Sequence, residues 1–395
     1  MARAKTTLSA EEIEELRKRV ALAIGPVKEP ESGREYAYGW ARTKAGRELP
    51  PYYMVYLLLV ELMRFGHGGR GEKVAWTIPV DYEGSGALIE HRKMGLGIFS
   101  AAQAEDELVA EDIVKAIHRG VKAAAPFFDH LAAKAVEKSR LNVRNNSSWL
   151  FNRYEYLRKQ FRQQIAEADA RKHEVKKTGD VLGNGTTVTS YSHPGFSLRQ
   201  EAGWLGIAAI DAFFSWTEHV LIHIAILKGK IKTGEEIADM AGADWADKVK
   251  AAIDLDDAAM KALYDDLLVI RRQIRNYMAH GAFGKQGEAF EFHSGAGAVP
   301  VNLTDPDGRD RFSMWGSPSF DEGRAVETAD AFVEKLWAGE MAQAKLYIQD
   351  ADLPIILPYA SDGTYQKGMK SVEDMEYLIE GMTRMLDGAM NMDWW

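Results

Sequence analysis

The longest apolar stretch of this sequence, GIAAIDAFFSWTEHVLIHIAIL at 206–227, restricts the fold more than any other feature. It is long enough to cross a bilayer, but it contains two acids and two histidines. These are Asp211, Glu218, His219 and His223. Each acid at the middle of a membrane costs roughly 2.5–3.5 kcal/mol on insertion scales. We therefore predict a helix buried in a soluble core, with no membrane partner, whose polar side chains need partners or a function.

Length and composition indicate a large globular protein. At 395 residues the chain should hold two domains, or one domain with extensions. Hydrophobic residues make up 46% and charged residues 27%, as in folded rather than disordered chains. There is no cysteine, which excludes disulfides, thiol nucleophiles and cysteine-based zinc sites. The N-terminal residues lack the apolar core of a secretory signal, so we expect a cytoplasmic protein.

Charge is negative overall, at a formal −9, which is unusual for a general nucleic-acid binder. Between 134 and 177, however, basic residues exceed acidic ones and aromatic residues are interleaved with them. One interpretation is an amphipathic helix whose rings face a core and whose charges face water. The other is a positive face that follows RNA phosphates, with Arg158, Lys159 and Arg162 as candidates. Both interpretations can hold on opposite faces of one helix.

The segment up to residue 135 mixes helix and strand patterns. Ser9 and Glu12 are spaced as a capping box for an N-terminal helix. The further elements that we predict are a helix at 51–64, strands at 72–82 and 87–100, and two helices within 104–138 that are divided near Pro126. Pro79 in the first strand indicates a sheet edge or a bulge. These patterns predict a smaller α+β region over 1–135, for which the sequence indicates no role.

The remainder of the chain is predominantly helical. The predicted elements are a helix at 147–175, a polar loop at 177–197, helices at 199–228, 235–252 and 256–280, a hairpin at 289–303 and a turn at 305–308. Ser319 and Glu322 form a second capping box, for a helix that extends to about 345. We therefore predict a mainly α fold. It comprises a helical bundle over 140–345 with a short β-hairpin, and a 346–395 extension that carries an amphipathic Met-rich helix.

Two sequence motifs resemble phosphate- or metal-binding sites, but neither meets the requirements of such a site. GHGGRG at 66–71 follows a helix and precedes a strand, the reverse of a phosphate-binding loop, so we interpret it as a flexible connection. His219 and His223 are one turn apart and could share a metal. No third ligand is evident, however, and buried core histidines are the simpler interpretation. We expect no metal and no cofactor.

The stretch RNYMAHG at 275–281 has a fully structural interpretation. The helix before it carries one apolar stripe at three- and four-residue spacing, formed by Leu263, Leu267, Ile270, Ile274 and Tyr277. Off that stripe lie Arg271, Arg272, Arg275 and Asn276. Gly281 follows His280 as a C-cap glycine, and cations in a last turn interact favourably with the helix dipole by roughly 0.3–1 kcal/mol each. On this interpretation Arg275 and His280 are simply the C-terminal residues of a capped helix.

The same stretch also resembles the signature of the HEPN superfamily, the higher eukaryote and prokaryote nucleotide-binding domains. That signature is an arginine, a polar residue, three to five more residues and a histidine at the end of a helix. Arg275, Asn276 and His280 match it in order and spacing. The helix DAFFSWTEHVLIHIAIL looks like the family's other core helix, which often carries an acid facing the site. Glu218 is the first candidate for that acid and Asp211 the second, with Arg272 as a further supporting residue.

This resemblance implies a HEPN-like helical bundle that cleaves RNA without a metal, as a homodimer whose two arginines and two histidines form a shared site. Histidine, with an unperturbed pKa of about 6.5, can take the proton of the 2′-hydroxyl or protonate the leaving oxygen. A guanidinium can stabilise charge that develops on the phosphate. On one helix Arg275 and His280 point about 140° apart, so a two-fold partner could supply the missing half.

Three interpretations of function remain open. The first is a HEPN endoribonuclease, by family analogy a toxin or antiphage effector with an antitoxin or regulatory protein as partner. The second is an inactive HEPN module that binds a nucleotide or a partner protein, with Arg275 and His280 structural. The third places the main activity in the N-terminal part and leaves dimerisation to the HEPN part.

Overall fold

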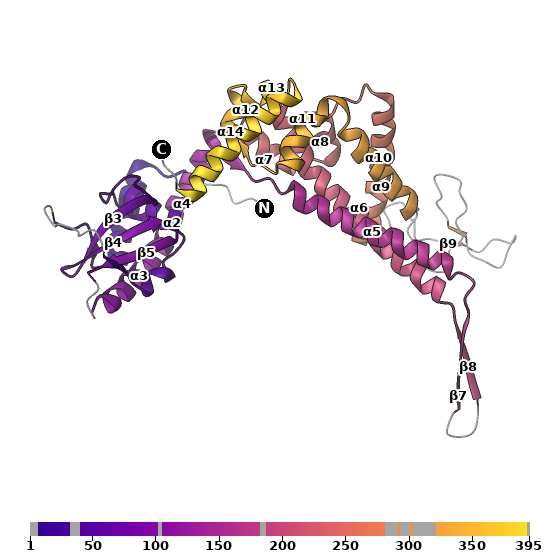
Figure 1. The fold of residues 1–395 in the computed structure, drawn as a ribbon, viewed down its shortest axis with the longest axis horizontal. Coiled ribbons are helices and arrows are strands. Elements are labelled where there is room, and N and C mark those ends of the chain that lie inside the picture. Colours follow the sequence, from indigo (N-terminus) through magenta and orange to yellow (C-terminus); the bar gives the residue numbers. More distant parts are fainter. Residues whose placement is uncertain are drawn as a thin grey trace. The chain divides into compact units, whose positions relative to one another are not determined.

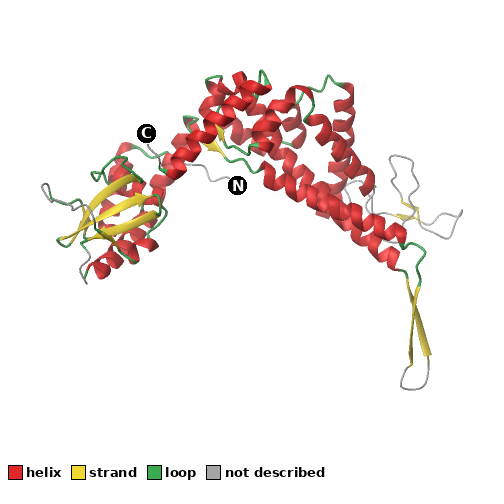
Figure 2. Cartoon of the chain, viewed as in Figure 1, coloured by secondary structure: helices red, strands yellow, loops and turns green. Residues whose placement is uncertain are grey.

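The protein is mainly helical with small antiparallel sheets, which confirms the predicted fold class at that level (Figure 2). The computed structural model describes residues 7–31, 40–101, 105–181, 187–280, 291–292, 301–302 and 321–392. Two compact units are formed (Figure 1). Unit 1 comprises Met1–Leu141, Thr233–Glu235 and Leu378–Trp395, and unit 2 comprises Asn142–Lys232 and Glu236–Tyr377.

The boundary between the units follows residue 141, close to the end that we predict for the α+β region. The predicted bundle at 140–345 and extension at 346–395 are divided differently in the structure. Unit 2 continues to Tyr377, and the residues after it belong to unit 1. The Met-rich helix of the extension is present as α14, Val372–Asn391, and crosses that division.

Unit 1 is built on a five-stranded antiparallel sheet with the order β1-β3-β4-β5-β2. Its strands are β1 Val27–Lys28, β2 Ala41–Arg42, β3 Val74–Tyr82, β4 Ser85–Arg92 and β5 Gly95–Ser100. The single strand predicted at 87–100 is therefore wrong. It is two strands, joined by a tight turn at which Gly95 has a φ of 97°, and glycine adopts this conformation without strain.

The position of Pro79 agrees with the predicted sheet edge. Pro79 lies opposite Leu88 of β4, whereas β1 pairs with β3 only at Asp81 and Tyr82. The missing N–H of the proline therefore removes no hydrogen bond between β1 and β3. A register shift between Val74 and Trp76 adds a bulge in the same strand.

Helices cover this sheet and form the core of unit 1 with it. They are α1 Ala10–Ile24, α2 Tyr52–Tyr56, η2 Leu57–Leu62, α3 Asp106–Ala123 and α4 Ala125–Glu137. A short helical turn, η1 Ala45–Glu48, follows β2. The predicted capping box is confirmed, because the Ser9 hydroxyl accepts from the Glu12 N–H and the Glu12 carboxylate accepts from the Ser9 N–H.

Unit 2 is organised around two long antiparallel helices, α5 Ser147–Ala170 and α6 Pro194–Leu227. The polar loop predicted between them is wrong. The chain forms an antiparallel ribbon, β7 Lys176–Val181 with β8 Thr187–Ser192, which extends beyond the end of the helix pair (Figure 1). Every residue of β8 is exposed, so the strand has no buried apolar alternation. This is why a pattern search classifies the segment as loop.

Helix α6 is the central element of unit 2. It is long and apolar enough to cross a membrane by length and composition, and 61% of its most apolar window is buried inside the protein. Phe213 packs edge-on against Phe332 of α10, Glu322–Leu336, and Trp216 contacts Trp337, the C-cap residue of that helix. The close approach of α10 requires Gly206, because an added Cβ there would lie 2.9 Å from the Cβ of Glu322.

Shorter elements complete unit 2. They are β6 Asn142–Val143, α7 Gly234–Gly242, α8 Trp245–Ala252, α9 Ala258–His280, β9 Glu291–Phe292, β10 Val301–Asn302, η3 Gly339–Met341, α11 Ala342–Lys345, η4 Leu346–Asp350, β11 Ile355–Ile356, α12 Leu357–Ser361 and α13 Thr364–Gly368. The helix predicted at 235–252 is two helices, α7 and α8. The predicted 289–303 hairpin is confirmed by the antiparallel pairing of β9 with β10. The capping box at Ser319 is wrong, because α10 begins at Glu322 with Asp321 as its N-cap.

Candidate functional site

Residues 275–280 of the motif lie in the last turns of α9, as the sequence predicts, and Gly281 lies outside the described residues. Helix α9 ends at His280, and the side chain of Arg275 is exposed on it. Asn276 and His280 belong to the helix, but their side chains, like the predicted turn at 305–308, lie outside the described residues. The apolar stripe is confirmed for Leu267, Ile270 and Ile274, which are buried.

The acid that we expect on the neighbouring core helix lies against α9. Glu218 of α6 forms an ion pair with Arg271 of α9 and a second one with Lys248 of α8, whose Nζ is 3.1 Å from the carboxylate. The Lys248 side chain is only 3% exposed, whereas Glu218 and Arg271 are each about one-third exposed. The carboxylate therefore connects three helices, with one cation sealed in the interior and one near the surface.

The electrostatics of this cluster keep Glu218 ionised. Burial by itself would raise the pKa of Glu218, but the hydrogen bonds and charges of Arg271 and Lys248 outweigh it and hold that pKa below its ordinary value of 4.5. Lys248 also donates to the carbonyl of Ala241, at 3.2 Å, so its buried ammonium has a second acceptor. Both cations are thus compensated within unit 2.

Aromatic rings hold one cation of this cluster, Arg271, in place. The Arg271 guanidinium lies 5.2 Å from the ring centroid of Phe214 and 6.0 Å from that of Trp245. Trp245 is buried, and its indole N–H donates to the hydroxyl of Thr217 at 3.0 Å. A guanidinium stacked on rings and paired with a carboxylate has little rotational freedom, which fixes where α9 lies against α6.

The two other supporting residues are not part of this cluster. The carboxylate of Asp211 pairs with Arg153 of α5 at 3.3 Å, and both side chains are largely exposed. Arg272 is exposed on α9. Of the expected supporting residues, then, the structure brings Glu218 into contact with the motif helix, and it pairs Asp211 with α5 instead.

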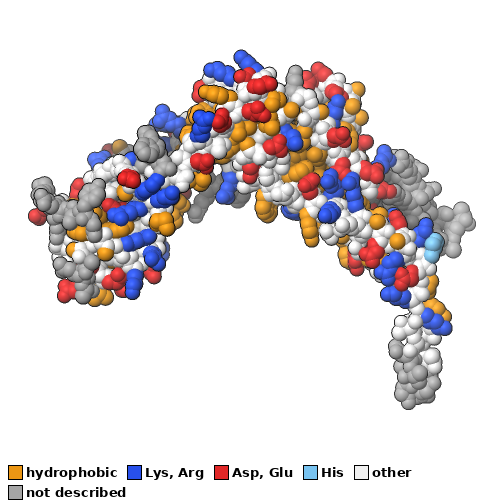
Figure 3. Space-filling view, viewed as in Figure 1, with side chains coloured by type: hydrophobic (Ala, Val, Ile, Leu, Met, Phe, Trp, Pro, Cys, Tyr) orange, Lys and Arg blue, Asp and Glu red, His pale blue; other side chains and the backbone are white. Residues whose placement is uncertain are grey.

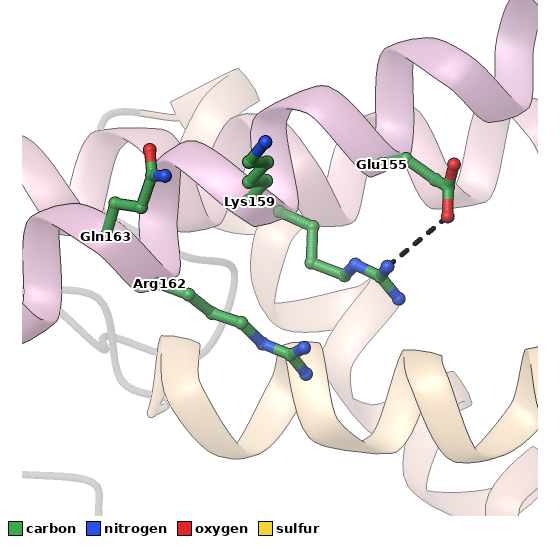
Figure 4. Close-up of a pocket in the computed structure, with 5 residues that line it drawn as sticks. Glu155, Lys159, Arg162 and Gln163 are labelled. Atoms are coloured by element: carbon green, nitrogen blue, oxygen red, sulfur yellow. Dashed lines mark hydrogen bonds and ion pairs between the residues drawn. The ribbon is translucent and has the colours of Figure 1, made fainter.

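The three residues expected to bind RNA lie together on α5, but they are not equally available. Arg158 and Arg162 both pair with Asp330 of α10, which also accepts from the hydroxyl of buried Tyr154 at 2.7 Å. Figure 4 shows Arg162 extended toward α10 and Lys159 pointing away from it. Together with Glu155 and Gln163 these residues line a shallow hollow of about 290 Å³.

This network has the character of a structural link between helices. Burial raises the pKa of the Tyr154 hydroxyl, and its hydrogen bond to Asp330 raises it further, so the tyrosine stays a neutral donor. Burial alone would lower the pKa of Arg158, but the carboxylate of Asp330 raises it overall. Of the three predicted RNA-binding residues, Lys159 is the one whose charge no described carboxylate compensates at ion-pair distance.

The two histidines on α6 make hydrogen bonds within unit 2. Nε2 of His219 accepts from the Asn146 N–H at 2.9 Å, and Nδ1 of His223 lies 2.9 Å from the His219 carbonyl oxygen. Burial and the neighbouring His223 lower the pKa of His219 to about 3, and burial lowers that of His223 as well. Both rings are neutral core residues at neutral pH. Among the described residues no group of three or more side chains could hold a metal ion.

Comparison with known proteins adds no assignment. No protein-family model matches the chain, and neither the curated proteins nor the solved structures contain a match.

Lys248 is the residue of this cluster that sequence reasoning missed. It lies on a short amphipathic helix, where a lysine is normally solvated, and nothing local distinguishes it from its neighbours. Arg271 is predicted to lie off the apolar stripe, and it is in fact half-buried against Glu218. What the cluster presents chemically is a rigid contact between α6 and α9, with the exposed guanidinium of Arg275 one helical turn beyond it.

Proposed function

We propose that this protein is a metal-independent endoribonuclease of the HEPN type that acts as a homodimer. The observation that carries the proposal is the exposure of Arg275 on a helix that ends at His280. An arginine that served only the fold would be expected to pair with a neighbouring carboxylate, as Arg271 does with Glu218. The exposed guanidinium is instead available for the phosphate of a bound RNA.

The chemical role that we assign to each residue follows from its side chain. His280 takes the 2′-hydroxyl proton or protonates the leaving oxygen, since its imidazole titrates near neutrality. Arg275 stabilises the charge that develops on the phosphate. Because five residues separate them on one helix, they point about 140° apart, and a second copy related by a two-fold axis places one of each on the same phosphate. Glu218 orients α9 and does not touch the RNA.

The test is cleavage of total RNA by purified protein in the presence of EDTA, compared with the variants His280→Ala and Arg275→Ala. Lys261→Ala is the matched control, because it removes an exposed cation from the same helix at a distance from the motif. We expect loss of cleavage in the first two variants and full cleavage in the control. Equal cleavage by the parent and His280→Ala overturns the proposal, as does cleavage that disappears with EDTA. A mass measurement tests the dimer.

A non-catalytic HEPN module, which binds a nucleotide or a partner protein, is the second candidate. The observation in its favour is that Glu218 is held by two cations and has a structural role. In that case the parent is as inert toward RNA as His280→Ala. Growth arrest on expression of the parent, relieved by His280→Ala, would support the toxin or antiphage role that the endoribonuclease assignment carries with it.

A further inference from the structure

Exposed aromatic side chains are concentrated on the α5–α6 pair and the ribbon between them. Every tryptophan or phenylalanine that is exposed in the described part of the chain lies between 149 and 204. Trp149 is 68% exposed, Tyr156 64% and Trp204 61%. Large rings are seldom left so open without a partner, and contiguous ones mark binding surfaces.

Two contacts between the helices show that these three rings share one face, here called the aromatic face. Arg153 of α5 pairs with Asp211 of α6, and Gln164 donates to Glu201 at 2.6 Å, which fixes the antiparallel register. Trp149 and Tyr156 lie one turn before and after Arg153 on the same side of α5. Trp204 lies two turns from Asp211 on the same side of α6. The rings therefore form a row along the helix pair.

The opposite side of α5 is the one that faces the core. Tyr154 and Phe161 are buried there, and Arg158 and Arg162 are neutralised by Asp330. The aromatic face thus excludes Arg158 and Arg162, two of the three basic side chains that the sequence favours for RNA. Its central charges, Arg153 and Asp211, cancel each other, so stacking rather than charge dominates its chemistry.

Positive charge increases toward the ribbon. Four acids along this path are paired: Glu155 with Arg158, Glu167 and Glu174 with Arg171, and Asp169 with Arg199. Glu201 instead accepts a hydrogen bond from the amide of Gln164. Four lysines form no ion pair within the described part of the chain, namely Lys159, Lys172, Lys176 and Lys177. Figure 3 shows Lys and Arg side chains around the root of the ribbon, beside hydrophobic ones. At that root the Lys177 ammonium lies 6.0 Å from the ring of Tyr191.

We propose that the aromatic face is a binding surface for single-stranded RNA. Bases stack on Trp149, Tyr156 and Trp204, and the phosphates continue to Lys176 and Lys177 at the root of the ribbon. The combination of open rings and uncompensated lysines fits unpaired bases on a polyanion, whereas a duplex keeps its bases stacked inside.

The choice of RNA rests on the proposed function, and the surface contains neither Arg275 nor His280. Binding is therefore measured in the full chain carrying His280→Ala, which removes the proposed cleavage. The probe is a short fluorescein-labelled oligouridine, followed by anisotropy. Base–aromatic stacking predicts that Trp149→Ala and Trp204→Ala each weaken binding by about fivefold to a hundredfold. Trp149→Phe keeps a ring and most of the affinity.

Salt dependence separates stacking from charge. The aromatic variants keep the slope of log affinity against log salt, whereas Lys176→Ala combined with Lys177→Ala lowers its magnitude by about 1.4. Tyr377→Ala is the matched control, because Tyr377 is 80% exposed on α14 and lies outside the face. We expect no change in affinity or slope for that variant.

Equal affinity of the parent and the Trp149→Ala/Trp204→Ala double variant overturns the proposal. It is also overturned if the double variant keeps its RNA affinity but loses dimerisation, or loses binding to vesicles of phosphatidylcholine and phosphatidylglycerol, since the occupant is then a second copy or a membrane. Tryptophan-dependent binding by a parent that never cleaves RNA refutes the endoribonuclease and leaves this surface standing. Cleavage of RNA by the parent, without tryptophan-dependent binding, supports the endoribonuclease and refutes the proposed binding surface.

Discussion

Replacement of Glu218 by glutamine tests how the core of unit 2 compensates its buried charge. The variant keeps the shape of the side chain but leaves the Lys248 ammonium, 3% exposed, with no carboxylate at 3.1 Å. Removal of one partner from a fully buried pair costs about 3–5 kcal/mol. Glu218 is 35% exposed and Arg271 32%, so water screens part of the interaction. We expect a loss of about 2 kcal/mol in the free energy of unfolding.

The assay is urea unfolding followed by tryptophan fluorescence, since Trp216 and Trp245 are buried in unit 2 and report its packing. Lys248→Met and the double variant complete a double-mutant cycle. Removal of both charges leaves no uncompensated ammonium, so the double variant should lose less stability than the sum of the single losses. Additive losses would show that the two side chains do not interact.

The same pair predicts a dependence on pH. Because the pKa of Glu218 is lower in the folded than in the unfolded chain, the ionised carboxylate contributes stability above 4.5. That contribution disappears as the pH falls from 4.5 through the folded-state pKa. The difference between the parent and Glu218→Gln should therefore shrink in acid. A glutamine variant as stable as the parent at neutral pH refutes the reasoning.

Four further substitutions test other parts of the protein. Gly206→Ala should lower the free energy of unfolding by about 1–3 kcal/mol, because the added Cβ meets that of Glu322. Gly381→Ala, where the added Cβ enters open space on α14, should raise the free energy of unfolding by up to about 1 kcal/mol, because alanine favours the helix. Urea unfolding measures both changes. Burial lowers the pKa of His219 to about 3, so the stability that its neutral ring provides should fall as the pH drops from 6.5. Melting temperatures measured over a pH series should show this fall in the parent and not in His219→Gln. Identical pH dependence of the two proteins contradicts the prediction. Asp330→Asn removes the carboxylate that pairs with Arg158 and Arg162 on the side of α5 opposite the aromatic face, so the salt slope of RNA binding measured by anisotropy should not change, and a steeper slope would place RNA phosphates on that opposite side.

Local features of the fold could be read from the sequence. The capping box of Ser9 and Glu12 and the stripe of Leu267, Ile270 and Ile274 each depend on residues a few positions apart. Neither requires knowledge of what packs against the helix, so the patterns were sufficient. The ribbon of β7 and β8 carries no such pattern, because its residues from Lys176 to Gly179 and from Thr187 to Ser192 are exposed and the two strands are held by their own ladder of hydrogen bonds.

The candidate site depends on contacts between residues far apart in the sequence, which local sequence patterns do not indicate. Lys248 meets Glu218 across 30 positions of the chain, and Arg158 meets Asp330 across 172. Helix α5 shows the consequence. The sequence permits either a core-facing or an RNA-facing set of side chains, and the packing of α10 decides which arginines are neutralised. The rings that remain open, Trp149 and Tyr156, are then the informative ones.

The ion pair between Glu218 and Arg271 also bears on how Arg275 is presented. Residues four apart on a helix lie on nearly the same side, so Arg271 and Arg275 project from neighbouring turns of α9. Glu218 holds Arg271 against α6, and the rings of Phe214 and Trp245 limit its movement. This fixes the rotation of α9 about its axis, and with it the direction of the exposed guanidinium one turn later. In a two-fold site, where each copy contributes half of the groups around one phosphate, an error in that rotation would displace both halves. Under the proposed function, a rigid acid–cation contact next to an exposed arginine is therefore what such a site requires, and Glu218 contributes only through the helix that it orients.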